Sequence, residues 1–410
     1  MKLFLLLREI KRIKIVVETT QIILNGPFEW AASPEAKALV KALGKTHVRF
    51  VGGAVRDSLL DKKISDIDVA TSLDPETVMK KLGVSKFKVI PTGLKHGTVT
   101  AVVNHQVFEV TTLRHDVETF GRHANVEFHD DWQADARRRD FTINALYLGA
   151  DGTLYDYFKG RADLKRGTVR FIGDASSRIE EDGLRILRLF RFHAWYGAGE
   201  IDPEALQEVQ KKLDMLDQLS AERVRQEILK TLGADNPVPE FEAMNESGVL
   251  KHVFPGFGFD FPGLKKLVSF EKDMAKVSAI RRLGALFKDQ GEEISQRLKL
   301  SNRERLRLRK METIPLPDPL NEKAIRAEIY LNGQGTFEDR LLLLGKGLEE
   351  IKQALKIADG FSPPKFPING KDLKASGLVP GIEMGERLKV LEQRWVESDF
   401  TLTKEALLKS

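Results

Sequence analysis

Cysteine is absent from this chain of 410 residues. Its absence excludes disulfide bonds, zinc sites built from thiolates and cysteine nucleophiles. Long hydrophobic runs are also missing, because no window approaches the roughly 18 uncharged apolar residues that a membrane helix needs. The apolar stretch Leu3 to Leu7 is followed at once by Arg8 and Glu9, so it is too short for the core of a secretion signal. We therefore expect a cytoplasmic protein with no membrane segment.

A strong excess of charge of one sign is missing as well. The formal net charge is +5 and the pI is about 9.0, while 42% of the residues are hydrophobic and 30% are charged. This composition is typical of a globular protein, and the length allows about two to four domains. The mild basic excess permits nucleic-acid binding but does not require it, because the distribution of the basic residues decides.

The chain changes character along its length. Residues 46–51 (THVRFV) are rich in strand-forming residues and stop at two glycines, and further strand patterns follow up to residue 112. From about residue 175 onward, one amphipathic helix pattern follows another. The sequence therefore predicts an α+β fold, in which a small mixed sheet precedes an all-helical part.

Two aspartates are spaced to stand side by side on a predicted strand. Asp66 and Asp68 alternate with apolar residues, and alternate side chains of a strand share one face. Upstream, the Gly52-Gly53 turn would let backbone N–H groups approach a phosphate, and Arg56 could add a bidentate contact. Carboxylates are the ligands that Mg²⁺ prefers, and two ions roughly 3.5–4 Å apart can promote a phosphoryl displacement. The repulsion between the two aspartates would then be neutralised by metal.

Simpler interpretations of these acids remain open. An isolated D-x-D pair is more often a turn or an exposed strand edge, and only the glycine turn upstream favours the metal site here. Glu109, which alternates with Phe108 and Val110 on a neighbouring predicted strand, is a candidate third carboxylate. An ordinary polar strand face explains Glu109 equally well.

A predicted helix near residue 190 carries charged residues at every third position. Asp182, Arg185, Arg188 and Arg191 follow this spacing, with leucines and a phenylalanine between them. One interpretation is an amphipathic helix with a basic solvent face. The other is that Arg188 and Arg191 hold a triphosphate, while Asp182 accepts from the amino group of a base and Arg185 donates to its ring. Cytosine and adenine both present an amino group beside an acceptor, which favours CTP and ATP.

Several segments together resemble class II CCA-adding enzymes, the tRNA nucleotidyltransferases of the polymerase-β superfamily. The similarity is strong over residues 47–233 and weaker beyond them. Bacterial poly(A) polymerases, CC-adding enzymes and A-adding enzymes share the same core. The segments that carry the resemblance are VGGAVRDSLLDKKISDIDVAT, LKHGTVTAVV, EVTTLRHDVETFGRHANVEF, RRRDFTINALYL, DYFKGRADL, EEDGLRILRLFRF and SAERVRQEILK.

The resemblance implies an architecture. It predicts a sea-horse-shaped molecule with a five-stranded catalytic head, followed by a helical neck, body and tail. Residues 114–127 would form the flexible loop that helps the enzyme switch from C to A. The expected divisions are an N-terminal, probably helical extension (1–45), the head (46–165), the neck (166–240), the body (241–330) and the tRNA-binding tail (331–410).

The resemblance also implies roles for individual residues. Asp66 and Asp68 would bind the metal ions, with Glu109 as the further catalytic carboxylate. The nucleotide-binding residues would be Gly53 and Arg56 at the turn, Arg139 near the triphosphate, the base-selecting pair Asp182 and Arg185, and Arg188 and Arg191 behind that pair.

The implied function is template-independent addition of C, C and A to the 3′ end of tRNA. The partners would be the acceptor and T-arm region of tRNA together with CTP and ATP, the cofactor would be two Mg²⁺ ions, and no obligate protein partner is implied. The alternatives are a poly(A) polymerase, a CC-adding or A-adding enzyme, and a non-catalytic RNA-binding relative. A poly(A) polymerase is disfavoured because its usual basic signature is missing from PTGLKHGTVT. A CC-adding enzyme typically lacks the flexible loop, whereas the 114–127 segment has its full length. A non-catalytic relative would be expected to lose Asp66 or Asp68, and both are present.

Three local features give further expectations. Gly183 stands where relatives often carry proline or alanine, which predicts a looser start to the helix that follows. The N-terminal extension has no counterpart in the resemblance, so we expect residues 1–40 to be dispensable for catalysis. The basic run from Arg297 to Lys310 is a candidate tRNA contact, although a solvated helix surface explains it at least as well.

Overall fold

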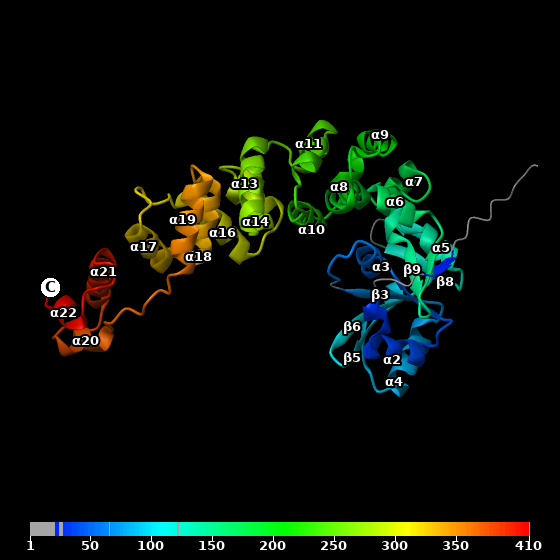
Figure 1. Ribbon diagram of the computed structural model, residues 1–410, viewed down its shortest axis with the longest axis horizontal. Helices are drawn as coiled ribbons and strands as arrows, with labels where there is room; N and C mark the ends of the chain where they lie inside the picture. Colours follow the sequence, from blue (N-terminus) through cyan, green and yellow to red (C-terminus); the bar gives the residue numbers. More distant parts are fainter. Residues whose placement is uncertain (1–20, 24–27, 65, 121–122, 410) are drawn as a thin grey trace, which may run out of the picture. The chain divides into compact units, whose positions relative to one another are not determined.

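The structure is a computed structural model that describes residues 21–23, 28–64, 66–120 and 123–409 (Figure 1). It divides into two compact units. The first comprises Met1–Leu219 with Ser247–His252, and the second comprises Ser220–Glu246 with Val253–Ser410. The division after Leu219 falls inside the predicted neck. The domain boundaries expected from the sequence therefore remain predictions.

The first unit is built on one mixed sheet, which confirms the α+β class. The sheet has eight strands among the described residues rather than the expected five, in the order β1-β10-β9-β2-β3-β6-β5-β4. All neighbouring pairs are antiparallel except β3 and β6, which are parallel. The strands are β1 (Gln21–Ile23), β2 (Val48–Val51), β3 (Ile67–Thr71), β4 (Lys88–Gly93), β5 (Thr98–Val103), β6 (Gln106–Thr112), β9 (Leu146–Gly149) and β10 (Thr153–Asp156).

The additional strands explain the difference in strand number. β9 is a continuous apolar run, and periodicity alone cannot distinguish a short buried strand from a buried helical segment. β10 and β1 then extend the sheet beyond β9, with Tyr155 paired to both Tyr147 and Gln21. The sheet is therefore widened by two strands from the end of the predicted head and by one strand from the N-terminal extension.

Part of the N-terminal extension belongs to the fold of the first unit. Besides β1, it forms the 3₁₀ turn η1 (Glu29–Ala32) and helix α2 (Pro34–Leu43), which begins at Ser33, whose side chain accepts from the amide of Ala36. Leu39 and Leu43 of α2 are fully buried. The expectation that residues 1–40 are dispensable is therefore not supported by the fold, because their removal would take away a helix that contributes to the core.

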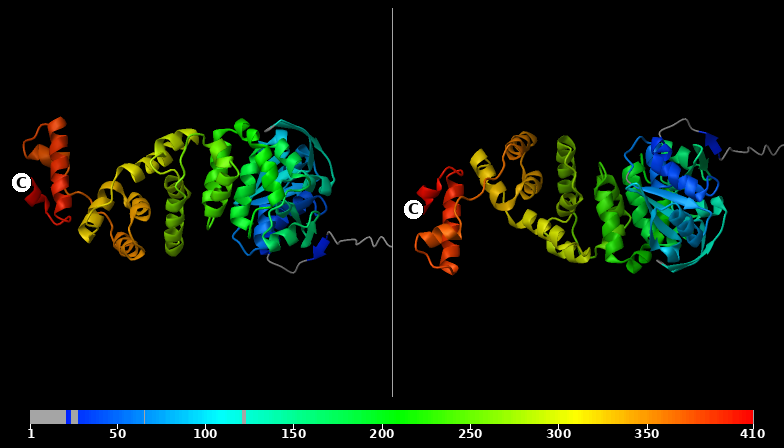
Figure 2. Two further views of the ribbon diagram at one scale, coloured as in Figure 1. Left: turned by 90° about the horizontal axis from the view of Figure 1, so that it is seen from above. Right: turned by 90° about the horizontal axis from the view of Figure 1, so that it is seen from below.

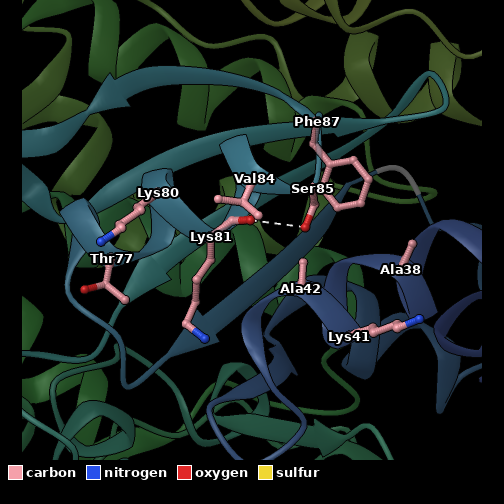
Figure 3. A pocket seen from close by; sticks show the side chains of 9 residues that line it. All are labelled: Ala38, Lys41, Ala42, Thr77, Lys80, Lys81, Val84, Ser85 and Phe87. Atoms are coloured by element: carbon pink, nitrogen blue, oxygen red, sulfur yellow. Dashed lines mark hydrogen bonds between the residues drawn. The ribbon is translucent and has the colours of Figure 1, made fainter.

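Helix α4 (Pro75–Val84) packs against α2 and against β4 and β5. A groove of about 740 Å³ lies between the two helices (Figure 3). Its rim carries Lys41, Lys80 and Lys81, its apolar lining includes Val84 and Phe87, and it contains none of the acids or arginines predicted for catalysis. The arrangement of side chains on the sheet, not this groove, must therefore identify the functional site.

The segment expected to be a loop is instead a two-stranded ribbon. β7 (Arg114–Phe120) and β8 (His123–Phe128) pair antiparallel, with a register shift between Asp116 and Glu118. An antiparallel pair with a local bulge can twist strongly, which suits a ribbon that leaves the main sheet. The first unit is completed by α3 (Gly53–Ser58), α5 (Trp132–Arg137), η3 (Thr142–Asn144), α6 (Gly160–Arg166), α7 (Ala175–Glu181), α8 (Leu184–Tyr196), α9 (Pro203–Lys211), η4 (Leu213–Gln218) and most of α12 (Val249–Val253).

The named elements of the second unit are all helices (Figure 2). One anchor of its core is a buried ionic cluster, in which Glu271 accepts from both Arg281 and Arg282, at 2.6 and 2.5 Å. None of the described helices of the chain combines the length and the apolar character that crossing a bilayer requires. The helices of this unit are α10 (Ala221–Leu232), α11 (Val238–Glu246), α13 (Phe261–Met274), α14 (Ala279–Leu286), α15 (Gly291–Arg297), α16 (Asn302–Thr313), α17 (Glu322–Asn332), α18 (Gln334–Leu344), α19 (Leu348–Asp359), α20 (Gly370–Ala375), α21 (Ile382–Glu397) and α22 (Lys404–Leu408).

Candidate active site

A tight turn joins β2 to α3 and forms one wall of the candidate site. Gly52 has a φ of +71°, which favours glycine over any residue with a side chain. A Cβ atom at Gly52 would lie 3.8 Å from both Nη1 of Arg139 and Oδ2 of Asp68. Three features that are distant in the sequence, the glycine turn, an arginine and a carboxylate, therefore meet at this point. Gly53, the first residue of α3, lies directly beside them.

The register of the sheet places the predicted carboxylates together. In the parallel pair β3/β6, Asp68 lies opposite Glu109, and on the other side it pairs with Val51, the residue before the turn. Directly opposed residues of neighbouring strands have their side chains on the same face of the sheet. Asp66 immediately precedes β3, two residues before Asp68, and is exposed. The strand geometry thus brings Glu109 next to the aspartate pair, which is one of the two arrangements that the sequence left open.

The electrostatics of Asp68 reflect this crowding. Burial raises the pKa of its carboxyl above the ordinary value, and the charges of Glu109 and Asp66 raise it further. Arg139 and Arg56 act in the opposite direction. A site that holds several carboxylates against their mutual repulsion is suited to a cation.

The carboxylates fit a divalent metal ion as a donor set. Among the described residues, no three His, Asp or Glu side chains are gathered closely enough to form a complete metal cage. Mg²⁺ is often bound by only one or two carboxylates, together with water and substrate phosphates. Asp68 and Asp66 could therefore supply protein ligands, while a triphosphate would have to supply others.

Arg139 is held rigidly beside the carboxylates. Its Nε donates to the hydroxyl of Tyr147 at 3.0 Å and its Nη2 donates to Asp135 at 3.2 Å. The Tyr147 hydroxyl also donates to Asp135, at 2.6 Å. Burial alone would raise the pKa of Asp135, but Arg139 and Arg138 hold it well below its usual range. Arg139 is thus a fixed cation at the site, as its predicted role near a triphosphate requires.

Arg56, which is expected to contact a phosphate, already has several partners within the protein. It is buried, and it donates to Asn144 at 2.5 Å, to the hydroxyl of Tyr196 at 2.7 Å, and to Asp57 at 2.9 Å. Its guanidinium also lies 4.0 Å from the centre of the Tyr196 ring. Its part in nucleotide binding remains a prediction, and the structure gives it a second role as a link between α3 and α8.

The predicted base-selecting pair lies where α7 ends and α8 begins. Asp182 is the C-cap of α7, and its Oδ1 accepts from the amide of Leu184 at 3.1 Å. Arg185 pairs with Glu181 at 2.5 Å and donates to the carbonyl of Arg138 at 3.2 Å. Asp182 and Arg185 are both partly exposed, so each has surface left for a ligand. Arg185 in addition contacts the arginine run that contains Arg139.

Gly183 is required by packing rather than by flexibility, which corrects the expectation of a looser helix start. A Cβ atom there would lie 2.5 Å from the carbonyl oxygen of Met215 and 2.9 Å from its carbonyl carbon. Its φ of −56° and ψ of −20° are ordinary helical values, so no backbone strain is involved. The glycine lets η4 approach the start of α8 and fixes the position of Asp182.

The side chains of Arg188 and Arg191 contact different residues. The Nε of Arg188 donates to Oδ2 of Asp140 at 2.7 Å, and its Nη2 donates to the same oxygen. The guanidinium of Arg191 lies 4.3 Å from the centre of the Phe192 ring. A triphosphate contact for either residue remains a prediction. The structure therefore brings together Gly53, Asp66, Asp68, Glu109 and Arg139, and it places Arg188 in a separate ion pair.

Five residues that hold the site in place do not stand out in the sequence. They share partial or full burial and a hydrogen bond to a predicted site residue, and they are Asp135, Asp140, Asn144, Tyr147 and Tyr196. One signal was available, because a buried charge needs a partner and the run RRRD places an acid, Asp140, beside the arginines.

Comparisons with known proteins first assign the class. Residues 48–170 match the family described as "Poly A polymerase head domain", and residues 200–259 match the one described as "Probable RNA and SrmB- binding site of polymerase A". The first match contains the turn, both aspartates, Glu109 and Arg139. The class is therefore that of the nucleotidyltransferases with a polymerase head, which use divalent metal ions in general.

Relatives along the whole chain then assign the family. The chain is 38% identical over 378 residues to CCA tRNA nucleotidyltransferase 1, mitochondrial, of Danio rerio, covering 88% of this chain and 86% of that protein. It is 32% identical over 375 residues to the CCA-adding enzyme of Limosilactobacillus fermentum, covering 88% and 91%. The crystal structure of the Bacillus stearothermophilus CCA-adding enzyme in complex with CTP superposes with a TM-score of 0.73 at 27% identity, covering 94% and 97%. The chain belongs to the CCA tRNA nucleotidyltransferase family, which confirms the resemblance.

The packing at Gly183 gives a first prediction. Replacing Gly183 with alanine should lower the free energy of unfolding by about 1–3 kcal/mol, because the added methyl group meets backbone atoms of Met215 that cannot rotate away. Thermal or urea unfolding would measure the loss. Gly83→Ala is the matched control, since nothing lies within 4 Å of a Cβ there and alanine favours a helix. If both variants were equally stable, the close approach of η4 would not constrain this position.

Proposed function

We propose that this protein adds C, C and A in turn to the 3′ end of tRNA, using CTP and ATP and no nucleic-acid template. The observation that carries the proposal is the register that places Asp68 opposite Glu109, beside the Gly52 turn and Arg139. The names of the relatives supply the substrate class, because they are called CCA tRNA nucleotidyltransferases and CCA-adding enzymes. A solved relative is described in complex with CTP.

The reaction is a nucleotidyl transfer. The terminal 3′ hydroxyl of the RNA loses its proton to solvent, and its oxygen forms a bond to the α-phosphorus of the nucleotide. The bond from that phosphorus to the oxygen that bridges to the β-phosphate breaks, and pyrophosphate leaves. We propose that Asp66 and Asp68 hold two Mg²⁺ ions, which when bound would neutralise charge on the attacking and leaving oxygens. Arg139, fixed by Asp135 and Tyr147, would stabilise negative charge on the phosphates.

Selection of the nucleotide is proposed to rest on Asp182 and Arg185. The carboxylate of Asp182 can accept from an exocyclic amino group, and the guanidinium of Arg185 can donate to the adjacent ring acceptor. Uracil and guanine present different groups at these positions. Because Gly183 locks the start of α8 against η4, the two side chains would read the base from a rigid position.

The tRNA must be held mainly through its backbone, since one enzyme that serves many tRNAs cannot depend on their sequences. The basic run 297–310 contributes less to this than its charge suggests. Arg305 pairs with Glu292, Arg307 with Asp339, and Arg297 donates to the carbonyl of Val253. Much of that charge is therefore engaged within the second unit, and a tRNA contact there remains a prediction.

From the sequence we propose that the protein is cytoplasmic. Similar proteins from Danio rerio and Homo sapiens are named mitochondrial, so the location of relatives varies. Fractionation of the source cells with an antibody to the protein would test the proposal, and recovery from an organelle would contradict it.

Product analysis tests the proposed activity. With tRNA that ends before the first C, CTP alone should add two residues, and CTP with ATP should add three and then stop. ATP alone should give little product. Sequencing gels of the extended 3′ ends would measure this. Long A tails with ATP alone would instead identify a poly(A) polymerase, and arrest after two residues with both nucleotides would identify a CC-adding enzyme.

The carboxylates give a prediction about chemistry. Asp68→Asn should lower the rate of addition of both C and A by on the order of 10²–10³, because it removes a group that acts on the developing charge. Binding of tRNA, measured by filter retention, should change little. Asp61→Asn is the matched control, because it removes an exposed carboxylate from the turn that precedes β3. Near wild-type turnover of Asp68→Asn at saturating Mg²⁺ would exclude the metal-binding assignment.

The pair Asp182 and Arg185 gives a prediction about specificity. Asp182→Ala and Arg185→Ala should raise the KM for CTP and ATP and relax discrimination against UTP and GTP, because a site built to hydrogen-bond one base rejects others strongly. Steady-state kinetics with each nucleotide on a tRNA primer would measure the ratios of kcat/KM. Lys165→Ala, which removes an exposed cation of the same unit, is the control. An equal loss with all four nucleotides would assign the pair a structural role.

A further inference from the structure

Five side chains of the first unit form a chain of hydrogen bonds whose two ends lie on α8, so that the helix itself closes them into a ring. Arg188 of α8 donates to Asp140, whose other oxygen accepts from the side-chain amide of Asn144 at 2.9 Å. The side-chain carbonyl of Asn144 accepts from Arg56 at 2.5 Å. Arg56 in turn donates to the hydroxyl of Tyr196 at 2.7 Å, and Tyr196 is the last residue of α8. The ring therefore begins and ends on the same helix.

The ring is shielded from water at its centre. Arg56, Asp140 and Asn144 are only 7%, 8% and 7% exposed. Hydrogen bonds to charged groups in such surroundings are strong, and a broken member would leave a buried charge without its partner. Burial of the Asp140 carboxyl would raise its pKa, but Arg188 holds that pKa below its usual range. The charge of Arg56 is met by Asp57, which lies outside the ring. The ring is thus stiff, and its members depend on one another.

The ring grips α8 at two points. Arg188 and Tyr196 are eight residues apart, which corresponds to about 12 Å along a helix axis. A helix held at one point can pivot, whereas two separated points fix both its direction and its rotation about its axis. Arg185, the predicted base-selecting arginine, lies one turn before the first of these points.

The other side of the ring borders the catalytic turn. Arg56 belongs to α3, which starts at the Gly52-Gly53 turn. Asn144 ends the short helix η3, and its backbone oxygen lies 3.9 Å from the position that a Cβ atom of Gly52 would take. Asp68 approaches the same position to within 3.8 Å. The ring therefore spans from the helix that would read the base to the turn beside the reacting phosphate.

We propose that Asp140 and Asn144 are positioning residues, which fix the nucleotide-selecting end of α8 relative to the carboxylates of β3. The proposal rests on the proposed nucleotidyl transfer and assigns these residues no contact with the substrate. Arg188 then acts through Asp140, rather than through the triphosphate contact expected from the sequence. A bound nucleotide would be held at its base by α8 and at its phosphates by the sheet, so the ring sets the alignment of the α-phosphorus for attack.

A double-mutant cycle between Asp140 and Arg188 tests the proposal. Asp140→Asn and Arg188→Gln should each lower kcat for both CTP and ATP by about 10–100-fold, since a misplacement on the order of 1 Å can cost this much. The KM for each nucleotide should change little. The double variant should be no slower than the slower single variant, because both substitutions break the same link.

Two further variants keep the test decisive if Asp140→Asn does not fold. Tyr196→Phe removes one hydroxyl and keeps the aromatic side chain that stacks on Arg56. This variant should have a lower kcat and nearly the same KM. Arg188→Lys keeps the positive charge but cannot make both bonds to Asp140, so it should be nearly as slow as Arg188→Gln. Asp74→Ala is the stability control, because Asp74 only caps α4; it should lower the melting temperature and leave kcat unchanged.

Other outcomes would overturn the proposal. If the effects of Asp140→Asn and Arg188→Gln multiplied and Arg188→Lys restored activity with a raised KM, Arg188 would contact the triphosphate directly. If folded Asp140→Asn and Tyr196→Phe turned over like the wild type, the ring would be structural only. Wild-type product analysis is run first on the same tRNA. A wild-type product other than C, C and A would contradict the proposed function. The double-mutant cycle would still test the positioning proposal, because it can be measured with any nucleotide that the wild type uses.

Discussion

The parallel pairing of β3 with β6 is the constraint on which the site depends. It is the single parallel contact in a sheet whose other described pairs are antiparallel, and it sets Asp68 opposite Glu109. A shift of one residue in this register would turn Asp68 against the buried face and expose Val69. The apolar residues of β3 therefore keep the acids in place, since the burial of Ile67 and Val69 specifies the face on which Asp68 must lie.

Much of the candidate site could be predicted from the sequence, because the local signals are strong. The aspartate spacing, the glycine turn and the helix at residue 184 follow from short-range rules of strand alternation, backbone freedom and helical periodicity. The partnership of Asp68 with Glu109 could be expected only as one of two equal possibilities. Strand order is a long-range property, and a single sequence does not show which strands become neighbours.

The features that escaped prediction depend on tertiary contacts. The extra strands β1 and β10 were missed because each finds its partner only once β9 is in the sheet. Gly183 was read as a source of flexibility, although the reason for a glycine there is the backbone of Met215, which is remote in the sequence. The position of Arg56 after the glycine turn and the helical spacing of Arg188 both favour a phosphate contact. Their buried partners Asn144 and Asp140 have no periodic pattern that would reveal them.

The division of the chain into two units limits how it can be cut into fragments that fold. The first unit needs Ser247–His252, which follow two helices of the second unit in the sequence, and the chain crosses between the units three times. No single cut can therefore release either unit whole, since an N-terminal fragment that keeps this segment must also carry α10 and α11. A gene encoding such a protein cannot exchange its catalytic part by simple joining at one boundary. A joint at any single boundary would leave a segment of one unit on the wrong side of the joint.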